Sequence, residues 1–157
     1  MINLIVANSE NNVIGKDNKL IWKQREDMLM FMRTTTGKTV IMGRKTFESM
    51  DSKPLKNRRN VVVSKNTSPI DVEGVELFVS LDEALESDDE VFVIGGGEIY
   101  KQTIDRADNI YQTIIHADVE GDTYFPEIPS GFYIQSEKKF EKDEKNQYDY
   151  TFLEWTK

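Results

Sequence analysis

The sequence predicts an α/β fold with a mostly parallel sheet that ends in an antiparallel C-terminal hairpin. Three short, continuous apolar runs, at residues 40–42, 61–63 and 91–94, have the pattern of strands buried on both faces. Helical patterns separate these runs, and strands that alternate with helices are typical of parallel sheets. Near the end of the chain, residues 132–140 and 148–155 flank a charged connector and predict an antiparallel hairpin.

The other elements follow in chain order. Residues 2–7 predict a first buried strand, and residues 8–19 predict a long polar loop, which is usually functional because ordering it costs backbone entropy. Further strands are expected at residues 75–79 and 110–116. Within the hairpin, a shift in apolar alternation between Phe152 and Leu153 suggests a β-bulge. Helices are expected at residues 26–33, at 46–50, from a capping box at 80–83 through Leu85, and from the glycines at 95–97 to Arg106.

Composition and charge exclude several classes of protein. The length of 157 residues favours one domain, residues 1–157, and no apolar stretch or leader predicts a membrane span or secretion. Zero cysteines exclude disulfides and thiolate metal sites and fit a reducing cytoplasm, which is the expected location. His116 has no metal-ligand partner at motif spacing, so we expect it to be structural. The net charge of −8 repels nucleic acid and anionic membranes, so an anionic ligand requires a local gathering of cations.

Gly95, Gly96 and Gly97 follow a buried strand and precede a helix. This arrangement brings bare backbone N–H groups up to an anion, whereas a strand-to-helix turn without a ligand would need only one glycine. The stretch is not a Rossmann fingerprint, because the sixth position is Tyr100 instead of glycine. Residues 37–39 (GKT) likewise lack the upstream glycine and the following helix of a phosphate loop.

Three predicted strand ends carry groups that suit an anion, and the carboxyl ends of parallel strands meet at one edge of a sheet. Glycines suit a pyrophosphate that touches backbone, whereas exposed cations and hydroxyls suit a phosphate monoester such as a ribose 2′-phosphate. An NAD site would place an acid there, so the inferred cofactor is NADPH. The residues concerned are Gly43, Arg44, Lys45, Thr46, Ser64, Lys65, Gly95, Gly96 and Gly97.

Asp27 is a carboxylate in the apolar company of the predicted helix at residues 26–33. The pattern leaves two orientations open: inward beside Phe31, one turn on, or outward as a first-turn partner of the helix dipole. Burial would raise the pKa of Asp27 and let it hydrogen-bond the N–H groups of a heterocycle. Because the sequence contains no nucleophile–base pair or metal cluster, such a site suits hydride transfer, in which a cofactor makes the bond.

Six motifs follow one another along nearly the whole chain: NVIGKDNKLIW at 12–22, Asp27 with Phe31, VIMGRKTFESM at 40–50, VVVS at 61–64, VFVIGGGEIY at 91–100 and VEGDTYFP at 119–126. In this order they resemble the dihydrofolate reductase family. The resemblance implies an eight-stranded, mostly parallel sheet with about four helices. It also implies a monomer that reduces 7,8-dihydrofolate to tetrahydrofolate with NADPH, by hydride transfer to pterin C6 with protonation at N5.

The resemblance also assigns roles to individual residues. Asp27 would bind the pterin N3 and 2-amino groups, Thr113 would hydrogen-bond its carboxylate, and Trp22 would help to hold an ordered water. Arg58 would bind the glutamate α-carboxylate of the substrate, which suits a bidentate guanidinium. Without the resemblance, the preferred interpretation of Arg58 would be a basic residue in a surface loop. The expected walls of the substrate pocket are Ile5, Met28, Phe31, Met50 and Leu55. The expected cofactor contacts further include Ala7, Ile14, Gly15, Asn18, Ile99 and Tyr100, with a cis peptide at Gly95–Gly96.

Two departures from the family pattern concern the cofactor side. Ile21 stands where the family usually has proline, and Glu98 stands where a basic residue can assist the cofactor. Two other functions compete with the leading hypothesis: a related NADPH reductase of riboflavin synthesis and a nucleotide-binding module without turnover. Arg58 argues against the first because that substrate has no glutamate tail, and an acid within an apolar helix argues against the second.

Overall fold

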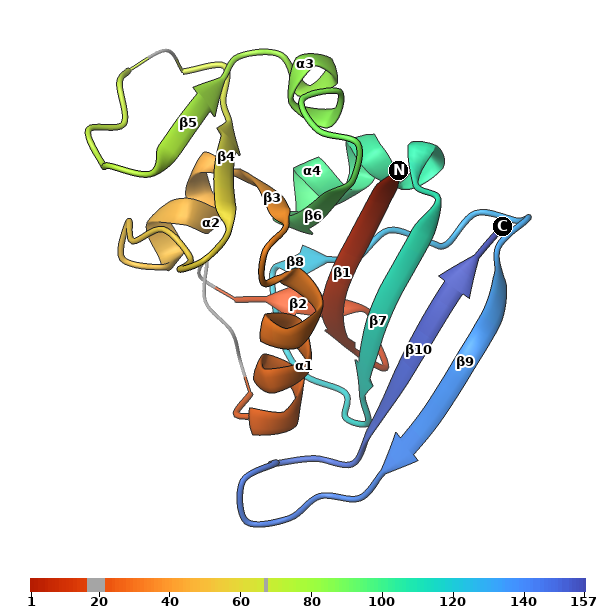
Figure 1. The fold of residues 1–157 in the computed structure, drawn as a ribbon. Helices are drawn as coiled ribbons and strands as arrows, with labels where there is room; N and C mark the ends of the chain where they lie inside the picture. The colour runs from red at the N-terminus through yellow and green to blue at the C-terminus, as the bar shows by residue number, and fades with distance from the viewer. Residues whose placement is uncertain (17–21, 67) are drawn as a thin grey trace.

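A computed structural model describes residues 1–16, 22–66 and 68–157, which form an eight-stranded sheet and a separate two-stranded sheet (Figure 1). The main sheet has the order β5-β4-β3-β6-β1-β7-β10-β9, in which β10 pairs antiparallel with both β7 and β9, and the other pairs are parallel. This confirms the predicted mostly parallel sheet with an antiparallel C-terminal hairpin. The strands are β1 (Ile2–Ser9), β3 (Thr39–Gly43), β4 (Arg59–Val63), β5 (Val75–Phe78), β6 (Val91–Gly95), β7 (Asn109–Ile115), β9 (Tyr133–Phe140) and β10 (Tyr150–Thr156).

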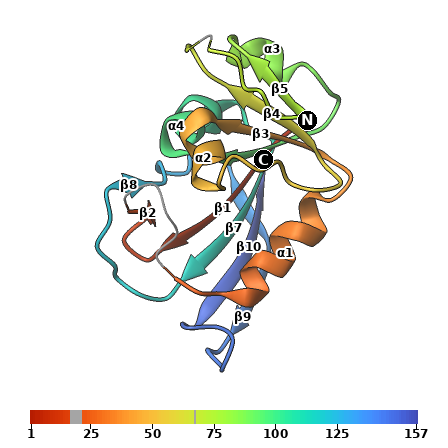
Figure 2. The same cartoon turned by 90° about the vertical axis from the view of Figure 1, so that its left-hand side faces the viewer.

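Helices cover both faces of this sheet. Figure 2 shows α1 on one side of the central strands and α4 on the other. Ser80 is the N-cap of α3, as the predicted capping box requires, since its Oγ accepts a hydrogen bond of 3.2 Å from the backbone N–H of Glu83. None of the described helices is long and apolar enough to cross a membrane. The helices are α1 (Arg25–Thr35), α2 (Arg44–Ser49), α3 (Leu81–Leu85) and α4 (Gly97–Thr103), followed by the 3₁₀ helix η1 (Ile104–Arg106).

Most of the core lies in two apolar layers, one on each face of the sheet. Leu4 and Ile41 belong to the layer that packs under α3 and α4, whereas Ile5 and Val40 belong to the layer that packs under α1 and α2. Neighbouring residues of a strand point to opposite faces, so strands buried on both sides need apolar residues at every position. The continuous apolar runs in the sequence follow from this arrangement.

Two sequence predictions are wrong in detail. The polar loop predicted at residues 8–19 contains the end of β1 and a further strand, β2 (Val13–Gly15), which pairs with β8 (Thr123–Tyr124) in the small sheet. The predicted helix at 26–33 is also less buried than its apolar middle indicates, because Met28 and Met32 are 60% and 48% exposed. Successive helical residues are about 100° apart around the axis, so five consecutive apolar side chains cannot all face one sheet.

The predicted β-bulge exists but lies further along the hairpin. The register between β10 and β9 shifts between Glu154 and Trp155, two residues beyond the position expected from the apolar alternation. A bulge places two residues of one strand opposite one residue of its partner, so its position depends on the partner strand as well.

Candidate functional site

The three predicted strand ends meet at one edge of the sheet. Strand β3 lies between β4 and β6 and runs parallel to both, with Gly43 opposite Val63 and Met42 opposite Gly95. Neighbouring side chains leave little room there: a Cβ atom on Gly43 would lie 3.3 Å from Ile99 Cγ1, and one on Gly96 would lie 3.1 Å from Thr46 Oγ1. Glycine at these positions avoids both contacts, and a backbone without side chains suits the approach of an anion.

The glycines at the end of β6 adopt a special backbone geometry. The peptide between Gly95 and Gly96 is cis, as the resemblance implies. Gly95 has a φ of +122°, and a Cβ atom there would lie 3.3 Å from the ring of Tyr100. A side chain at Gly95 is thus disfavoured by both the dihedral angle and the ring. Gly97 follows as the first residue of α4.

Cations at this edge have neutral partners. Arg44 donates to Ser64 Oγ at 3.3 Å and to the carbonyl oxygens of Asn66 and Ser68 at 3.1 and 2.6 Å. Arg44 thereby links the end of β3 to the segment that follows β4. Lys45 and Lys65 are exposed, and in the part of the chain that the structure describes no carboxylate forms an ion pair with any of these three cations. Their charge is available to a phosphate monoester.

Asp27 points inward from the first turn of α1. The hydroxyl of Thr113, a fully buried residue of β7, donates a hydrogen bond of 2.7 Å to Asp27 Oδ1. Burial raises the pKa of Asp27, and the Thr113 hydrogen bond opposes that increase only in part. Of the two orientations that the sequence left open, the structure therefore shows the inward one. A half-buried carboxylate with a raised pKa is a common feature of functional sites.

Tyr100 lies between the acid and the glycine edge. Its ring is buried, and its hydroxyl donates a hydrogen bond of 2.6 Å to the backbone oxygen of Ile5. Burial raises the pKa of Tyr100, and the negative charge of Asp27 raises it further. Tyr100 is therefore a neutral hydrogen-bonding group within the electrostatic reach of Asp27.

Trp22 lies directly before α1, in a small apolar cluster with Ile115 and Tyr150. Its indole ring is 6% exposed, and its Nε1 has no hydrogen-bond partner among the residues that the structure describes. Buried indole N–H groups usually have a partner, so this donor fits a role in binding solvent or ligand.

Arg58 extends toward the other end of α1. Its Nη1 donates to Thr35 Oγ1 at 3.1 Å, its Nε donates to the Lys56 carbonyl at 3.0 Å, and its guanidinium carbon lies 5.8 Å from the centre of the Phe31 ring. Burial lowers the pKa of Arg58, but a guanidinium remains charged at neutral pH. Because these partners are neutral, the charge suits a substrate carboxylate.

The remaining predicted residues fall into groups by location. Ile5, Phe31, Met50 and Leu55 share the apolar layer beneath α1 and α2, whereas Met28 is mostly exposed. Ile14 packs on the opposite layer, Ala7 packs near Trp22, and the carbonyl of Gly15 accepts a hydrogen bond from the backbone N–H of Asp122. Glu98 is exposed in the first turn of α4. The predictions for Asn18 and Ile21 lie outside the described residues.

Sequence reasoning missed two residues near this site. Thr35 contacts Arg58, and Ile94, at the end of β6, packs in the same apolar layer as Ile5 and Phe31. Thr35 lies four residues after Phe31, one helical turn on, and this spacing could have revealed it. His116 hydrogen-bonds Glu10 and Thr151 at the sheet periphery, as fits a structural residue.

The fold and the site define a class of protein: an α/β protein in which glycines and cations line one sheet edge and a half-buried acid points inward from α1. Comparisons with known proteins specify the family. A sequence profile described as dihydrofolate reductase matches residues 1–157. The dihydrofolate reductase of Bacillus subtilis is 42% identical over 161 residues, which cover 100% of this chain and 95% of the relative. The dihydrofolate reductase of Haemophilus influenzae is 44% identical over 154 residues, covering 96% and 94%.

Comparison with solved structures agrees. One similar structure is dihydrofolate reductase from Enterococcus faecalis complexed with NADP(H) and RAB-propyl. It superimposes on this chain with a TM-score of 0.92 and is 35% identical in sequence. The match covers 99% of this chain and 95% of the Enterococcus faecalis chain. The chain belongs to the dihydrofolate reductase family. This confirms the resemblance seen in the sequence and the fold that it implies.

Proposed function

We propose that the protein catalyses the NADPH-dependent reduction of 7,8-dihydrofolate to 5,6,7,8-tetrahydrofolate. The observation that carries this proposal is the inward orientation of Asp27, held by Thr113 on the face of the sheet that also carries Phe31. We place the reaction in the cytoplasm, which the absence of cysteine suits. We assign it to a monomer, as the resemblance to the family implies.

The sheet edge fits NADPH. Gly43 and Gly96 allow the close backbone approach that a pyrophosphate requires, and Arg44, Lys45 and Lys65 can neutralise a ribose 2′-phosphate. The bound cofactor supplies a hydride to C6 of the pterin. The protein's own contribution is to bind and orient both reactants and to exclude water between them.

Asp27 orients and polarises the substrate. Its carboxylate accepts hydrogen bonds from N3 and the 2-amino group of the pterin, while Thr113 holds one carboxylate oxygen in place. A negative charge next to the ring favours the protonated form of N5, which makes C6 a better hydride acceptor. Burial strengthens this electrostatic effect, because the dielectric response around Asp27 is lower than in water.

Arg58 binds the other end of the substrate. Its guanidinium is held near α1 by Thr35 and Phe31, so it can form a paired hydrogen bond with the α-carboxylate of the glutamate tail. The apolar layer that contains Ile5, Met50 and Leu55 lies on the same side of the sheet and suits the benzoyl ring.

The direct experiment mixes the purified protein with NADPH and dihydrofolate and follows the absorbance of NADPH in the near ultraviolet. We expect NADPH oxidation that depends on dihydrofolate and yields tetrahydrofolate in equal amount. If dihydrofolate does not stimulate NADPH oxidation, although the folded protein binds NADPH, the proposed reaction is wrong.

A further inference from the structure

Asn60 is a buried polar residue that neither the predicted site nor the proposed reaction includes. It is the second residue of β4 and is only 1% exposed. Its amide group forms three hydrogen bonds: Oδ1 accepts from the backbone N–H of Leu55 at 2.9 Å, and Nδ2 donates to the carbonyls of Leu55 and Arg58 at 2.9 and 3.0 Å. All three partners are backbone groups of the short segment, residues 55–58, that precedes β4.

These hydrogen bonds fix a segment that has little regular structure of its own. Asn57, within this segment, has a left-handed φ of 61°. Its carbonyl accepts from the N–H of Gly37 at 2.8 Å, and the N–H of Arg59 donates to the Lys38 carbonyl at 3.0 Å. The segment is therefore held from inside by Asn60 and from outside by the residues that follow α1. These hydrogen bonds hold the segment at a fixed position relative to α1, the helix that carries Phe31 and Thr35.

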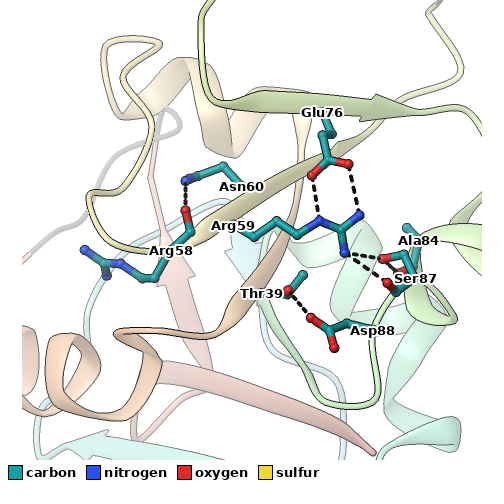
Figure 3. A network of polar contacts seen from close by, with 8 residues as sticks. All are labelled: Thr39, Arg58, Arg59, Asn60, Glu76, Ala84, Ser87 and Asp88. Carbon is teal, nitrogen blue, oxygen red and sulfur yellow. Dashed lines mark hydrogen bonds and ion pairs between the residues drawn. The ribbon is translucent and has the colours of Figure 1, made fainter.

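The structure also separates two consecutive arginines. Figure 3 shows Arg58 and Arg59 pointing in opposite directions, with Asn60 bonded to the Arg58 carbonyl. Arg59 binds both carboxylate oxygens of Glu76 at 2.6 and 3.0 Å and also Ser87, so its charge is used within the fold. Arg58, in contrast, donates hydrogen bonds to two neutral groups among the described residues, the Lys56 carbonyl and the Thr35 hydroxyl. The position of the backbone at Arg58 thus decides where the available guanidinium lies.

We propose that Asn60 is a positioning residue for substrate selection: it sets the position of Arg58 and thereby the preference for pterins that carry a glutamate tail. This inference rests on the proposed function and concerns the tail-binding end of the same site. Loss of the Asn60 donors would remove the hydrogen bonds to two partly buried backbone carbonyls, those of Leu55 and Arg58, so the segment would shift and move the Arg58 guanidinium away from the tail. The pterin end, at Asp27, would remain intact.

The test compares two substrates, dihydrofolate and dihydropteroate, which has the same pterin and benzoyl groups but no glutamate. Asn60→Asp is isosteric, keeps the acceptor for Leu55 and replaces the two donated hydrogen bonds with charge repulsion. We expect the KM for dihydrofolate to rise about tenfold, the change that the loss of one well-formed charged contact produces. The KM for dihydropteroate and both kcat values should remain within about twofold of the wild-type values.

A double-mutant cycle shows whether Asn60 acts through Arg58. In an Arg58→Ala background, Asn60→Asp should cause no further rise in the KM for dihydrofolate, because the group that it positions is gone. Additive effects in this cycle would overturn the inference. So would an equal rise in KM for both substrates. Should Asn60→Asp fail to fold, Asn60→Ser, which is smaller and uncharged, answers the same question.

Asn3→Asp is the matched control. Asn3 is also a fully buried asparagine at the start of a strand, but its side chain bonds Glu90 and Asn109, neither of which belongs to residues 55–58. This variant should lower the midpoint of unfolding and leave the ratio of the two KM values unchanged. If Asn3→Asp and Asn60→Asp change that ratio equally, Asn60 has only a structural role. If the wild-type protein reduces neither substrate, the proposed function itself fails.

Discussion

The two edges of the parallel sheet contain similar charged residues but use them differently. At the edge where the strands begin, Lys38 pairs with Glu90 at 2.8 Å and Arg59 pairs with Glu76 at 2.6 Å. At the edge where β3 and β4 end, Arg44 contacts only neutral groups among the described residues, and Lys45 and Lys65 are exposed.

This difference distinguishes cations that serve the fold from cations that can serve a ligand. At the first edge, the hydrogen bonds from Lys38 and Arg59 lower the pKa values of Glu90 and Glu76, so each charge has its counter-charge within the protein. At the second edge, glycines leave the backbone without covering side chains, and no ion pair joins these cations to a carboxylate among the described residues. A phosphate ester and a pyrophosphate are the ligands that such an edge suits.

The largest expected effect concerns the acid beside the second edge. Asp27→Asn should lower turnover of dihydrofolate by about a hundredfold at neutral pH, since general acid–base and charge effects of one group are typically of that size or larger. The loss should be smaller in acid, where N5 is protonated without help. The Kd of NADPH, measured by fluorescence, should not change. Loss of NADPH binding would mean that Asp27 lies in the cofactor site instead.

The next effect tests the cations of the second edge. Arg44→Ala should raise the Kd of NADPH about tenfold, because a charged hydrogen bond to the 2′-phosphate is lost, and it should change the Kd of NADH much less. Titration of cofactor fluorescence measures both values. Equal weakening for the two cofactors would remove the assignment of Arg44 to the 2′-phosphate.

A third effect follows from the pKa of Asp27. The pKa of Asp27 in the folded protein is raised above the ordinary value of 3.8, so folding favours the protonated carboxyl group. Proton binding by Asp27 therefore stabilises the folded protein at low pH. This stabilisation is lost as the pH rises through the raised pKa. Asp27→Asn, which cannot ionise, should therefore unfold at a higher temperature than the wild-type protein near neutral pH. The difference should disappear below the ordinary pKa. A constant difference across this pH range in thermal unfolding experiments would contradict the raised pKa.

The smallest effect belongs to the first edge. Glu76→Gln should reduce the free energy of unfolding by only about 0.5 kcal/mol, because the side chains of Arg59 and Glu76 are 32% and 48% exposed and solvent screens such a pair. Denaturant unfolding measures this change. The KM values for dihydrofolate and NADPH should remain at their wild-type levels. A marked rise in either would show that the first edge also serves a ligand.

The sequence predicted those features that local patterns encode. Apolar runs identified the buried strands, and the glycines and cations that follow them identified the edge at which three strands end. The orientation of Asp27 could not be predicted from its helix, because it depends on Thr113, 86 positions away in the chain. Likewise, β2 was missed because its partner, β8, is a strand of two residues far along the sequence.

Local sequence patterns also do not distinguish Arg58 from Arg59. The two residues are identical in chemistry, and only the alternation of side chains at the start of β4 and the position of Glu76 on β5 decide which one is paired. The role inferred for Asn60 depends on contacts with a segment that has no periodic pattern. Such contacts are visible only once the strands are assembled.

A crystal structure with NADPH and folate bound gives the most decisive test of the site. We expect the 2′-phosphate within hydrogen-bonding distance of Arg44 and the pyrophosphate against the glycines at the ends of β3 and β6. We also expect the pterin to face the Asp27 carboxylate. A cofactor bound elsewhere than at this edge, or a pterin that makes no contact with Asp27, would contradict the proposed site.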